Sequence, residues 1–439
     1  NKYYIFEIIS QGSTMLGSAL VAPALVSLLI LGFKKLFVKP KGAVLRLSTD
    51  NLIRHPRRTG SNVTTLMIGL VLVIMVAALN QSFKDTLNAW FDRVLAADVL
   101  ISSNGKLFAF QVQPLSEKLA DEIAKTPGIT KGPERSVYGI RFIHFNYSGK
   151  QLGLKAFDHP DPSTHYKLID VKEGGSQTEL GQRLFNEELN KNEPTVLVSE
   201  IFVFHHKKKT GDTLSIDTPA GRIDFKIIGV MVDYASPEGM IYISRESYKR
   251  FWRDNLVDGF SLNVEKGVSV EDVRRDIEAR LGKEKNIITV SQREMKSQVI
   301  TEVDKSFAYT KAIEAAALLV AFLGLFNTFM ISVLERTREM GMLRAIGMEK
   351  AQLTSMIMIE AVIQGAFGAV VAVVLGAGIS YLFVKNNLTY MLGWIVDYSF
   401  PTLVVGMTVF IGVFVAAVAA FYPARKAAGL EIRDALEYE

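Results

Sequence analysis

The sequence predicts a membrane α-helical protein with five transmembrane helices and a large α+β extracytoplasmic domain on a two-helix stalk. Three observations lead to this prediction. Charged residues are absent from five long apolar windows, strand-type alternation fills the stretch between the second and third windows, and apolar helical stripes extend these two windows beyond the membrane. The net charge of +5 is small and local, which argues against a nucleic-acid partner.

Each window is long enough to cross a membrane. A helix rises about 1.5 Å per residue, so about 20 apolar residues span the hydrocarbon. The uncharged windows run from Ser13 to Phe33, Thr59 to Phe83, Ala315 to Leu334, Ala361 to Val384 and Tyr398 to Ala424. Because a charge at the bilayer centre costs roughly 2.5–3.5 kcal/mol, windows this clean favour transmembrane helices over the buried helices of a water-soluble protein.

The basic residues set the direction of the spans, since cytoplasmic loops carry the excess of lysine and arginine. Against the single acid Asp50, the loop after the first window holds Lys34, Lys35, Lys39, Lys41, Arg46, Arg54, Arg57 and Arg58. This loop is therefore predicted to be cytoplasmic, and the region from Lys84 to Glu314 to be outside. The carboxyl terminus is then cytoplasmic and the amino terminus outside, which suggests a fragment or a processed chain.

These directions divide the chain into consecutive segments. They are a first transmembrane helix with an outer lead-in (1–38), a cytoplasmic basic loop with an interfacial helix (39–58), a second transmembrane helix with stalk (59–97), the extracytoplasmic domain (98–291), a stalk with the third transmembrane helix (292–334), a cytoplasmic helix (335–350), a fourth transmembrane helix (351–384), an outer loop (385–397), a fifth transmembrane helix (398–424) and a cytoplasmic tail (425–439).

Two apolar stripes predict the stalk. Residues at helical spacing continue past the second window and precede the third, so two helices project above the bilayer and pack together. The stalk residues are Phe83, Leu87, Trp90, Val299, Val303 and Phe307. Two short, separate surface helices are the alternative.

Between the stalk helices, alternation predicts an α+β domain in two lobes. The expected strands are Asp98–Ser102, Val137–Tyr147, Gln151–Phe157, Thr195–Ser199, Thr213–Asp217, Arg222–Val232, Met240–Ser244, Phe260–Val264 and Ile287–Val290. The expected helices are Leu115–Lys125, Arg245–Arg253 and Val270–Leu281, and Glu173–Leu180 is expected to be a surface loop between the lobes.

Catalytic and cofactor signatures are absent from the sequence. There is no cysteine, no G-x-x-x-x-G-K-[ST] phosphate loop, no G-x-S-x-G elbow and no H-E-x-x-H motif. The loop Asp158–His165 gathers histidines and aspartates, but its prolines favour a surface turn over a metal site, so no metal is expected. His205 and His206 precede three lysines and are expected to end a helix in solvent, with a lipid-headgroup patch as the alternative.

Polar and small residues within the spans predict helix packing. Asn327 is expected to hydrogen-bond between helices, and Glu360 either lies in the inner interface or pairs with Arg344 or a neighbouring helix. Small residues at four-residue spacing let helices approach closely, within this chain or with another. They are Gly368, Ala372, Gly376 and Ser380 in the fourth span and Gly412, Ala416 and Ala420 in the fifth.

The loop after the third span contains a short amphipathic helix. It is bracketed by glycines and is too short to cross the membrane, so it is either a membrane-surface turn or a peg for a soluble partner. Its candidate contact residues are Arg338, Glu339, Met340, Leu343, Arg344, Ile346 and Gly347.

This loop, ERTREMGMLRAIGMEKAQL, resembles that of the macrolide-exporter (MacB), lipoprotein-release and FtsX cell-division permeases. Three more stretches carry the resemblance: NLIRHPRRTG before the second span, TVLVSEIFVF with KKTGDTLSIDTPAGRIDFKIIGVMVDY in the outer domain, and YPARKAAGLEIRDAL at the carboxyl end. The likeness covers residues 45–439.

The resemblance implies the permease of an ATP-binding cassette (ABC) transporter in a bacterial inner membrane, driven by a separate cytoplasmic ATPase dimer that holds the ATP and magnesium. The short helix would be its coupling helix, and the stalk would move the outer domain, which is called mechanotransmission. The family's unit has four spans, so the extra first span suggests the carboxyl-terminal half of a ten-helix version that pairs with a second half-permease. An extracytoplasmic adaptor or lipoprotein is a further possible partner.

The sequence leaves two functions open. One is export or extraction of an amphiphilic substrate, and the other is signalling, in which the outer domain activates a partner such as a cell-wall hydrolase. An enzyme embedded in the membrane is disfavoured, because the catalytic motifs are missing.

Overall fold

The computed structural model describes residues 42–94, 97–103, 113–132, 135–158, 171–233, 236–388 and 395–429, with two isolated positions, 13 and 17. They form two compact units: residues up to 83 with 304–387 and 396 onward, and residues 84–303 with 388–395. Apart from positions 13 and 17, the first predicted window lies outside the described residues, as do the Asp158–His165 loop after Asp158 and the tail from residue 430.

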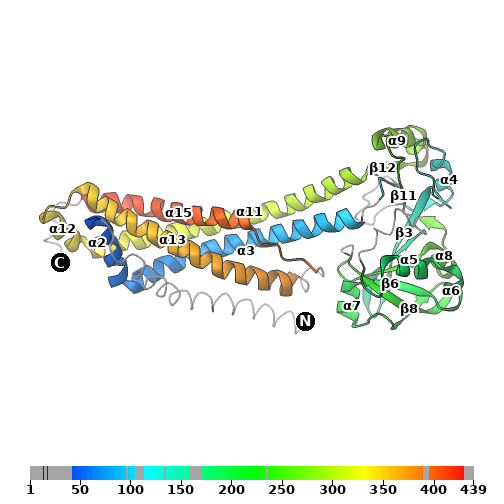
Figure 1. Cartoon of the computed structure of the whole chain (residues 1–439), viewed down its shortest axis with the longest axis horizontal. Coiled ribbons are helices and arrows are strands. Elements are labelled where there is room, and N and C mark those ends of the chain that lie inside the picture. Colours follow the sequence, from blue (N-terminus) through cyan, green and yellow to red (C-terminus); the bar gives the residue numbers. More distant parts are fainter. Residues whose placement is uncertain are drawn as a thin grey trace. The chain divides into compact units, whose positions relative to one another are not determined.

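The first unit is a bundle of helices (Figure 1). Its elements are α2 (Ala43–Arg54), α3 (Pro56–Val94), α11 (Gln292–Glu335), α12 (Thr337–Ala345), α13 (Lys350–Leu382), the π-helix η4 (Phe383–Asn387) and α15 (Thr402–Gly429). Among the described residues, four helices are long and apolar enough to cross a membrane: α3, α11, α13 and α15. The second and third predicted windows lie within α3 and α11. The fourth ends in η4, just beyond α13, and the fifth begins at Tyr398, four residues before α15.

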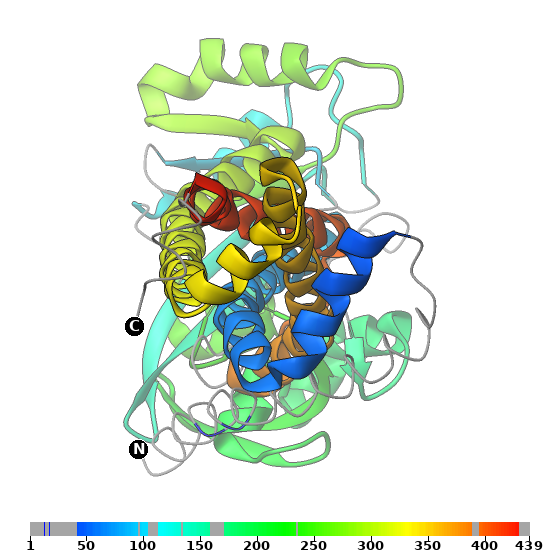
Figure 2. The same cartoon turned by 90° about the vertical axis from the view of Figure 1, so that its left-hand side faces the viewer.

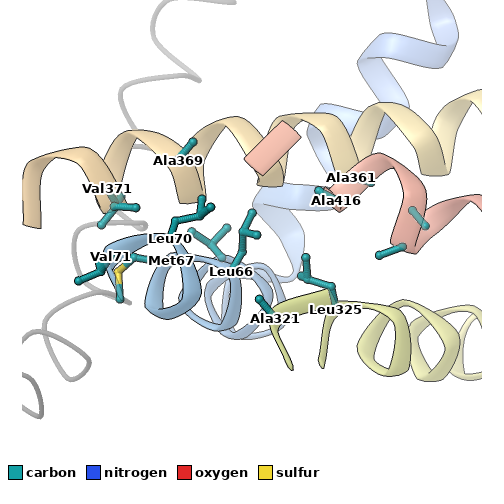
Figure 3. Close-up of a cluster of buried hydrophobic side chains, with 14 of the residues drawn as sticks. Leu66, Met67, Leu70, Val71, Ala321, Leu325, Ala361, Ala369, Val371 and Ala416 are labelled. Carbon is teal, nitrogen blue, oxygen red and sulfur yellow. The ribbon is translucent and has the colours of Figure 1, made fainter. Parts of the chain in front are cut away.

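Close contacts between α3, α13 and α15 hold the bundle together. A Cβ on Gly368 would lie 3.0 Å from Leu66, and one on Gly376 would lie 3.1 Å from Ile74, so the small face of α13 lies against α3. Leu66 and Leu70 of α3 belong to the same apolar core as Ala369 of α13 and Ala416 of α15 (Figure 3). The remaining predicted small residues, Ala372, Ser380, Gly412 and Ala420, are also buried. Both small-residue stripes therefore pack within this chain.

Replacing Gly365 by valine is expected to destabilise the bundle. A Cβ there would lie 2.8 Å from Cβ of Ala416 and 3.0 Å from the carbonyl oxygen of Gly412, and a backbone atom cannot move aside as a side chain can. Overpacking of this kind costs about 1–3 kcal/mol. Thermal unfolding of the purified protein in detergent checks this. Gly378→Val on the same helix is the control, since nothing lies within 4 Å of its Cβ position, and an equal loss in both variants would contradict the expectation.

The second unit is an α+β domain. Its strands are β1 (Val99–Ser103), β2 (Leu115–Ser116), β3 (Val137–Tyr147), β4 (Lys150–Phe157), β5 (Val171–Glu173), β6 (Thr195–Ser199), β7 (Thr213–Thr218), β8 (Gly221–Met231), β9 (Met240–Ser244), β10 (Leu256–Val257), β11 (Gly259–Leu262) and β12 (Ile287–Ser291). Ten of them form one sheet in the order β12-β1-β11-β3-β4-β9-β6-β8-β5, with β7 paired to β8, while β2 and β10 pair separately.

Short helices cover this sheet (Figure 1). They are α4 (Leu119–Ile123), α5 (Gln177–Phe185), α6 (Glu187–Asn192), α7 (Glu200–His206), α8 (Arg245–Trp252), α9 (Val270–Ile277), the π-helix η3 (Glu278–Gly282) and α10 (Lys283–Lys285). One apolar core gathers around β1, β11 and α9, and another around β4, β6 to β9 and α8. The long strand β3 contributes to both, through Val137 in the first and Ile143 against the second.

Three sequence expectations for this unit are wrong. The stretch predicted as a helix from Leu115 begins as strand β2, and its helix α4 is only one turn long. The stretch Glu173–Leu180 is not all loop, because α5 begins at Gln177 behind a capping box between Ser176 and Glu179. His206 ends α7 as expected, but its ring stacks on Phe202 with ring centroids 4.7 Å apart instead of extending into solvent.

Candidate functional site

The short helix α12 connects two membrane-long helices. Arg336, with φ −108° and ψ 14°, leaves helical geometry and separates α11 from α12, which has 9 residues. After the helix, Gly347 adopts a φ of 106°, a left-handed conformation that favours glycine, and the chain turns into α13. A glycine at this position therefore allows the turn that leads from α12 into α13.

The two faces of α12 differ. Met340 is buried, and Leu343 is half-buried in an apolar cluster with Val333 of α11 and Leu353 of α13. On the other face Arg338 is exposed, as are Met342 (50%) and Ile346 (82%). The predicted apolar edge is therefore divided. Met340 and Leu343 hold the helix on the bundle, and only Ile346, joined by Met342, is free for a partner.

Two charged residues of α12, Glu339 and Arg344, bond to their own chain. The Arg344 guanidinium donates to the carbonyl oxygen of Ala428 at 3.4 Å. Glu339 accepts a hydrogen bond of 2.8 Å from Nε of Arg336, and this bond lowers the pKa of the Glu339 carboxyl. The alternative that Glu360 pairs with Arg344 is wrong, because Glu360 bonds elsewhere.

Glu360 is the centre of a buried cluster, here called the ionic anchor, made of Glu360, Arg336, Arg58 and Asn51. Its carboxylate accepts a 2.8 Å hydrogen bond from Asn51 and lies 3.5 Å from Arg336 and 3.9 Å from Arg58. The side chains of Glu360 and Arg336 are only 5% and 7% exposed. Removing such charges from water costs several kcal/mol for each ion, which their mutual attraction and hydrogen bonds offset.

The ionic anchor joins α2, α3 and α13 to the junction between α11 and α12. Arg58 lies near the start of α3, Glu360 on α13, and Arg336 just before α12. Asn51 comes from α2, which lies beside α13 (blue and gold in Figure 2) and whose Ser48 donates to the carbonyl oxygen of Met356 at 3.0 Å. The segment 39–58 is predicted as a helix at the membrane interface, but its contact with α13 could not be predicted from local pattern, since the partners are about 300 residues apart.

Comparison with known families covers both units. The model of the FtsX-like permease C-terminal region matches residues 312–432, which include α12, and that of the MacB-like periplasmic core domain matches residues 59–280. The second match alone spans half of the chain. The chain belongs to the MacB/FtsX-type ABC transporter permeases. It is thus a membrane protein with a MacB-like periplasmic domain.

Individual relatives support the assignment of the chain to this family. An ABC transporter permease of Mycobacterium tuberculosis is 26% identical over 97% of this chain and 49% of its own length. The macrolide export ATP-binding/permease protein MacB of Bdellovibrio bacteriovorus is 26% identical over 89% of this chain and 61% of its own, and that of Chlorobaculum tepidum is 30% identical over 87% and 59%. The chain therefore spans about half to three fifths of the length of these relatives.

In this MacB/FtsX-type permease, α3 and α11 run unbroken through the segments predicted as stalk. The rings of Phe83 and Phe307 meet edge to face with centroids 5.4 Å apart, and one turn below, Asn80 donates to Thr310 at 3.1 Å. The other predicted stalk residues follow in the second unit: Leu87 is buried, Trp90 is half-buried with its ring 5.1 Å from that of Phe91, and Val299 and Val303 are half-buried.

The outer domain of the permease contains no group of three or more potential metal-ligating side chains within the described ranges. Asp158, the described member of the predicted histidine and aspartate loop, has structural partners. It accepts a 2.6 Å hydrogen bond from the backbone N–H of Gly139 and lies 3.2 Å from Arg135. Its carboxylate therefore closes the end of β4 against β3.

Proposed function

We propose that this chain is the permease unit of an ABC transporter of the mechanotransmission type. A separate cytoplasmic ATPase, which binds ATP and magnesium, docks on α12, and its closure displaces the bundle and the extracytoplasmic domain. The result is export or extraction of an amphiphilic substrate. The observation that carries this proposal is a short helix between two membrane-long helices, with Ile346 presented outward and the ionic anchor beneath it.

The chemistry of α12 supports docking of a protein. Apolar residues that extend from a short helix fit a hydrophobic groove, while neighbouring charges such as Arg338 fix the register. Ile346 is 82% exposed. Exposure of an apolar side chain to water is unfavourable, and burial in a hydrophobic groove would remove this free-energy cost. The ionic anchor supports transmission of movement. A displacement of α12 would be passed to α2, α3 and α13 through Arg336 and Glu360 and would not be taken up by the bending of a loop.

The close packing of the bundle supports a substrate that does not pass between its helices. Small residues bring α13 within contact of α3 and α15, and apolar side chains fill the core. We therefore assign the substrate to the amphiphiles, which can be taken from the outer leaflet. A second permease unit completes the transporter, and an extracytoplasmic adaptor or lipoprotein receives the substrate.

The orientation test uses the absence of cysteine from the chain. Single cysteines replace Ala345, exposed at the end of α12, and Glu188, exposed in the outer domain. A membrane-impermeant maleimide is expected to label Glu188→Cys in intact spheroplasts, and Ala345→Cys only after the membrane is permeabilised. Labelling of Ala345→Cys in intact spheroplasts would place α12 outside and refute the docking of a cytoplasmic ATPase.

A further inference from the structure

Two polar side chains interrupt the apolar face of the outer sheet that α5 covers in part. Lys155 of β4 and Tyr242 of β9 are register partners in parallel strands, so both side chains leave the sheet on the same face. The apolar cluster to which Tyr242 belongs includes Leu180 and Leu184 of α5. Lys155 and Tyr242, here called the polar pair, are therefore set in surroundings that otherwise suit hydrocarbon.

The hydroxyl of Tyr242 is buried without a partner. The side chain is 2% exposed, and its oxygen has no hydrogen bond to any residue that the structure describes. Burial of an unpaired hydroxyl is unfavourable, and a phenylalanine ring would fill the same space without that cost. The buried Tyr138 is different, because its hydroxyl donates to the carbonyl oxygen of Arg135 at 3.0 Å. The Tyr242 hydroxyl thus needs an explanation other than the stability of the described fold.

The Lys155 ammonium is also held in unfavourable surroundings. Its Nζ lies 5.4 Å from the centre of the Phe142 ring, and within the described ranges it has no ion pair or hydrogen bond. Desolvation by burial lowers the pKa of this ammonium, and the opposing effect of the Asp233 carboxylate is smaller. The side chain is only half-buried, so a molecule from solution can contact it.

We propose that the polar pair binds the anionic head group of an amphiphile, with one phosphate or carboxylate oxygen accepting from the Lys155 ammonium and another from the Tyr242 hydroxyl. Such hydrogen bonds to an anion are about twice as strong as neutral ones and supply both groups with an acceptor. The flexible four-carbon stem of Lys155 allows the small movement that admits an oxygen to the hydroxyl.

The surroundings of the polar pair suit the hydrocarbon part of the same ligand. Phe142 and Phe185 are half-buried and pack against the apolar cluster that contains Tyr242. A largely apolar lining with a few placed polar groups is typical of small-molecule sites. The site rests on the proposed permease function and specifies the charge of the amphiphile that the outer domain would take.

Another buried cation of the outer domain fits a ligand less well. The three side-chain nitrogens of Arg245 also lack hydrogen bonds to the part of the chain that the structure describes. This side chain is 0% exposed, however, and the Glu117 carboxylate lies 3.5 Å from it. Arg245 is therefore closed to solution and already faces an opposite charge, whereas Lys155 is partly open and has no such contact within the described ranges.

Binding of hexyl phosphate to the full chain in lipid nanodiscs tests the site by isothermal titration calorimetry. Inorganic phosphate and hexyl glucoside represent the two parts of this probe, and both are expected to bind more weakly. Lys155→Met and Tyr242→Phe are each expected to raise the Kd for hexyl phosphate by about ten- to hundred-fold, as for the loss of one hydrogen bond to a charged group. Lys226→Met is the control, at a lysine of β8 whose ammonium lies 3.9 Å from the exposed Glu193, and it is expected to leave the Kd unchanged.

Thermal unfolding without ligand separates a binding role of the polar pair from a structural one. Because the Tyr242 hydroxyl has no described partner, Tyr242→Phe is expected to keep or raise the Tm. Tyr138→Phe loses a hydrogen bond and is expected to lower it. An equal drop in Tm for both tyrosine variants would indicate a structural hydroxyl and overturn the proposal.

The binding data carry their own contrary outcomes. An unchanged Kd for hexyl phosphate in Lys155→Met and Tyr242→Phe would show that the polar pair does not form the site. Inorganic phosphate that binds as tightly as hexyl phosphate would overturn the assignment to an amphiphile. If hexyl phosphate does not bind while the ATPase still docks on α12, the head-group site is wrong and the permease function stands.

Discussion

Replacing Ile346 by aspartate is expected to abolish docking of the ATPase on α12. In the docked state proposed above, the side chain would enter an apolar groove, and a carboxylate there would lose its water without gaining a partner. The penalty for burying an unpaired charge is at least about 3 kcal/mol, which lowers affinity on the order of 100-fold or more. Co-purification with the ATPase from detergent, and ATP turnover of the reconstituted complex, measure the effect.

The control for this variant is Leu256→Asp, an apolar to acidic change in the outer domain at a leucine that is 43% exposed. It is expected to leave ATPase binding unchanged. Leu343→Asp is a poor probe, because Leu343 packs against Val333 and Leu353 and its loss would unfold the α12 end of the bundle. Full ATPase binding by Ile346→Asp would show that this edge of α12 is not the docking surface.

Replacing Glu360 by alanine is expected to lower the free energy of unfolding of the bundle by about 3–5 kcal/mol. The carboxylate is the shared partner of Arg336 and Arg58, and its removal leaves two guanidinium groups side by side in a buried site. Asn51 also loses its acceptor, which loosens α2 from α13. Thermal unfolding in detergent measures the loss.

The matched control is Glu335→Ala, which removes an exposed carboxylate next to Arg336 in sequence. Exposed substitutions of this kind change stability by about 0.5 kcal/mol or less. Glu360→Gln is expected to be intermediate, because the amide still accepts from Asn51 but no longer neutralises the arginines. A Glu360→Ala protein as stable as the wild type would mean that the ionic anchor does not hold these helices together.

Local pattern was sufficient to predict the membrane helices and most strands. The windows from Thr59, Ala315, Ala361 and Tyr398 overlap α3, α11, α13 and α15, because about twenty uncharged apolar residues are the length that a helix needs to cross the hydrocarbon. Strands such as β3 and β6 have the predicted bounds, since alternation over a half-buried sheet leaves a clear period.

What pattern could not predict depends on distant partners. The apolar edge of α12 looked uniform, but burial of Met340 and Leu343 is decided by residues on α11, α13 and α15. The partners of Glu360 lie about 300 residues away on α2 and next to α12 on Arg336. A local signal was missed at α5, where serine at 176 and glutamate at 179 form a capping box.

Two apolar cores of the outer domain, one around β1, β11 and α9 and one around β4, β6 to β9 and α8, share the strand β3, and this sharing has a mechanical consequence. Its partner β4 is matched to it at every position from Ile140 to Tyr147, so the strands are held by a continuous ladder of main-chain hydrogen bonds. Because β3 continues from one core into the other, a change of tilt between the two cores would have to bend this strand. We therefore expect a pull on one core to be passed along β3 to the other.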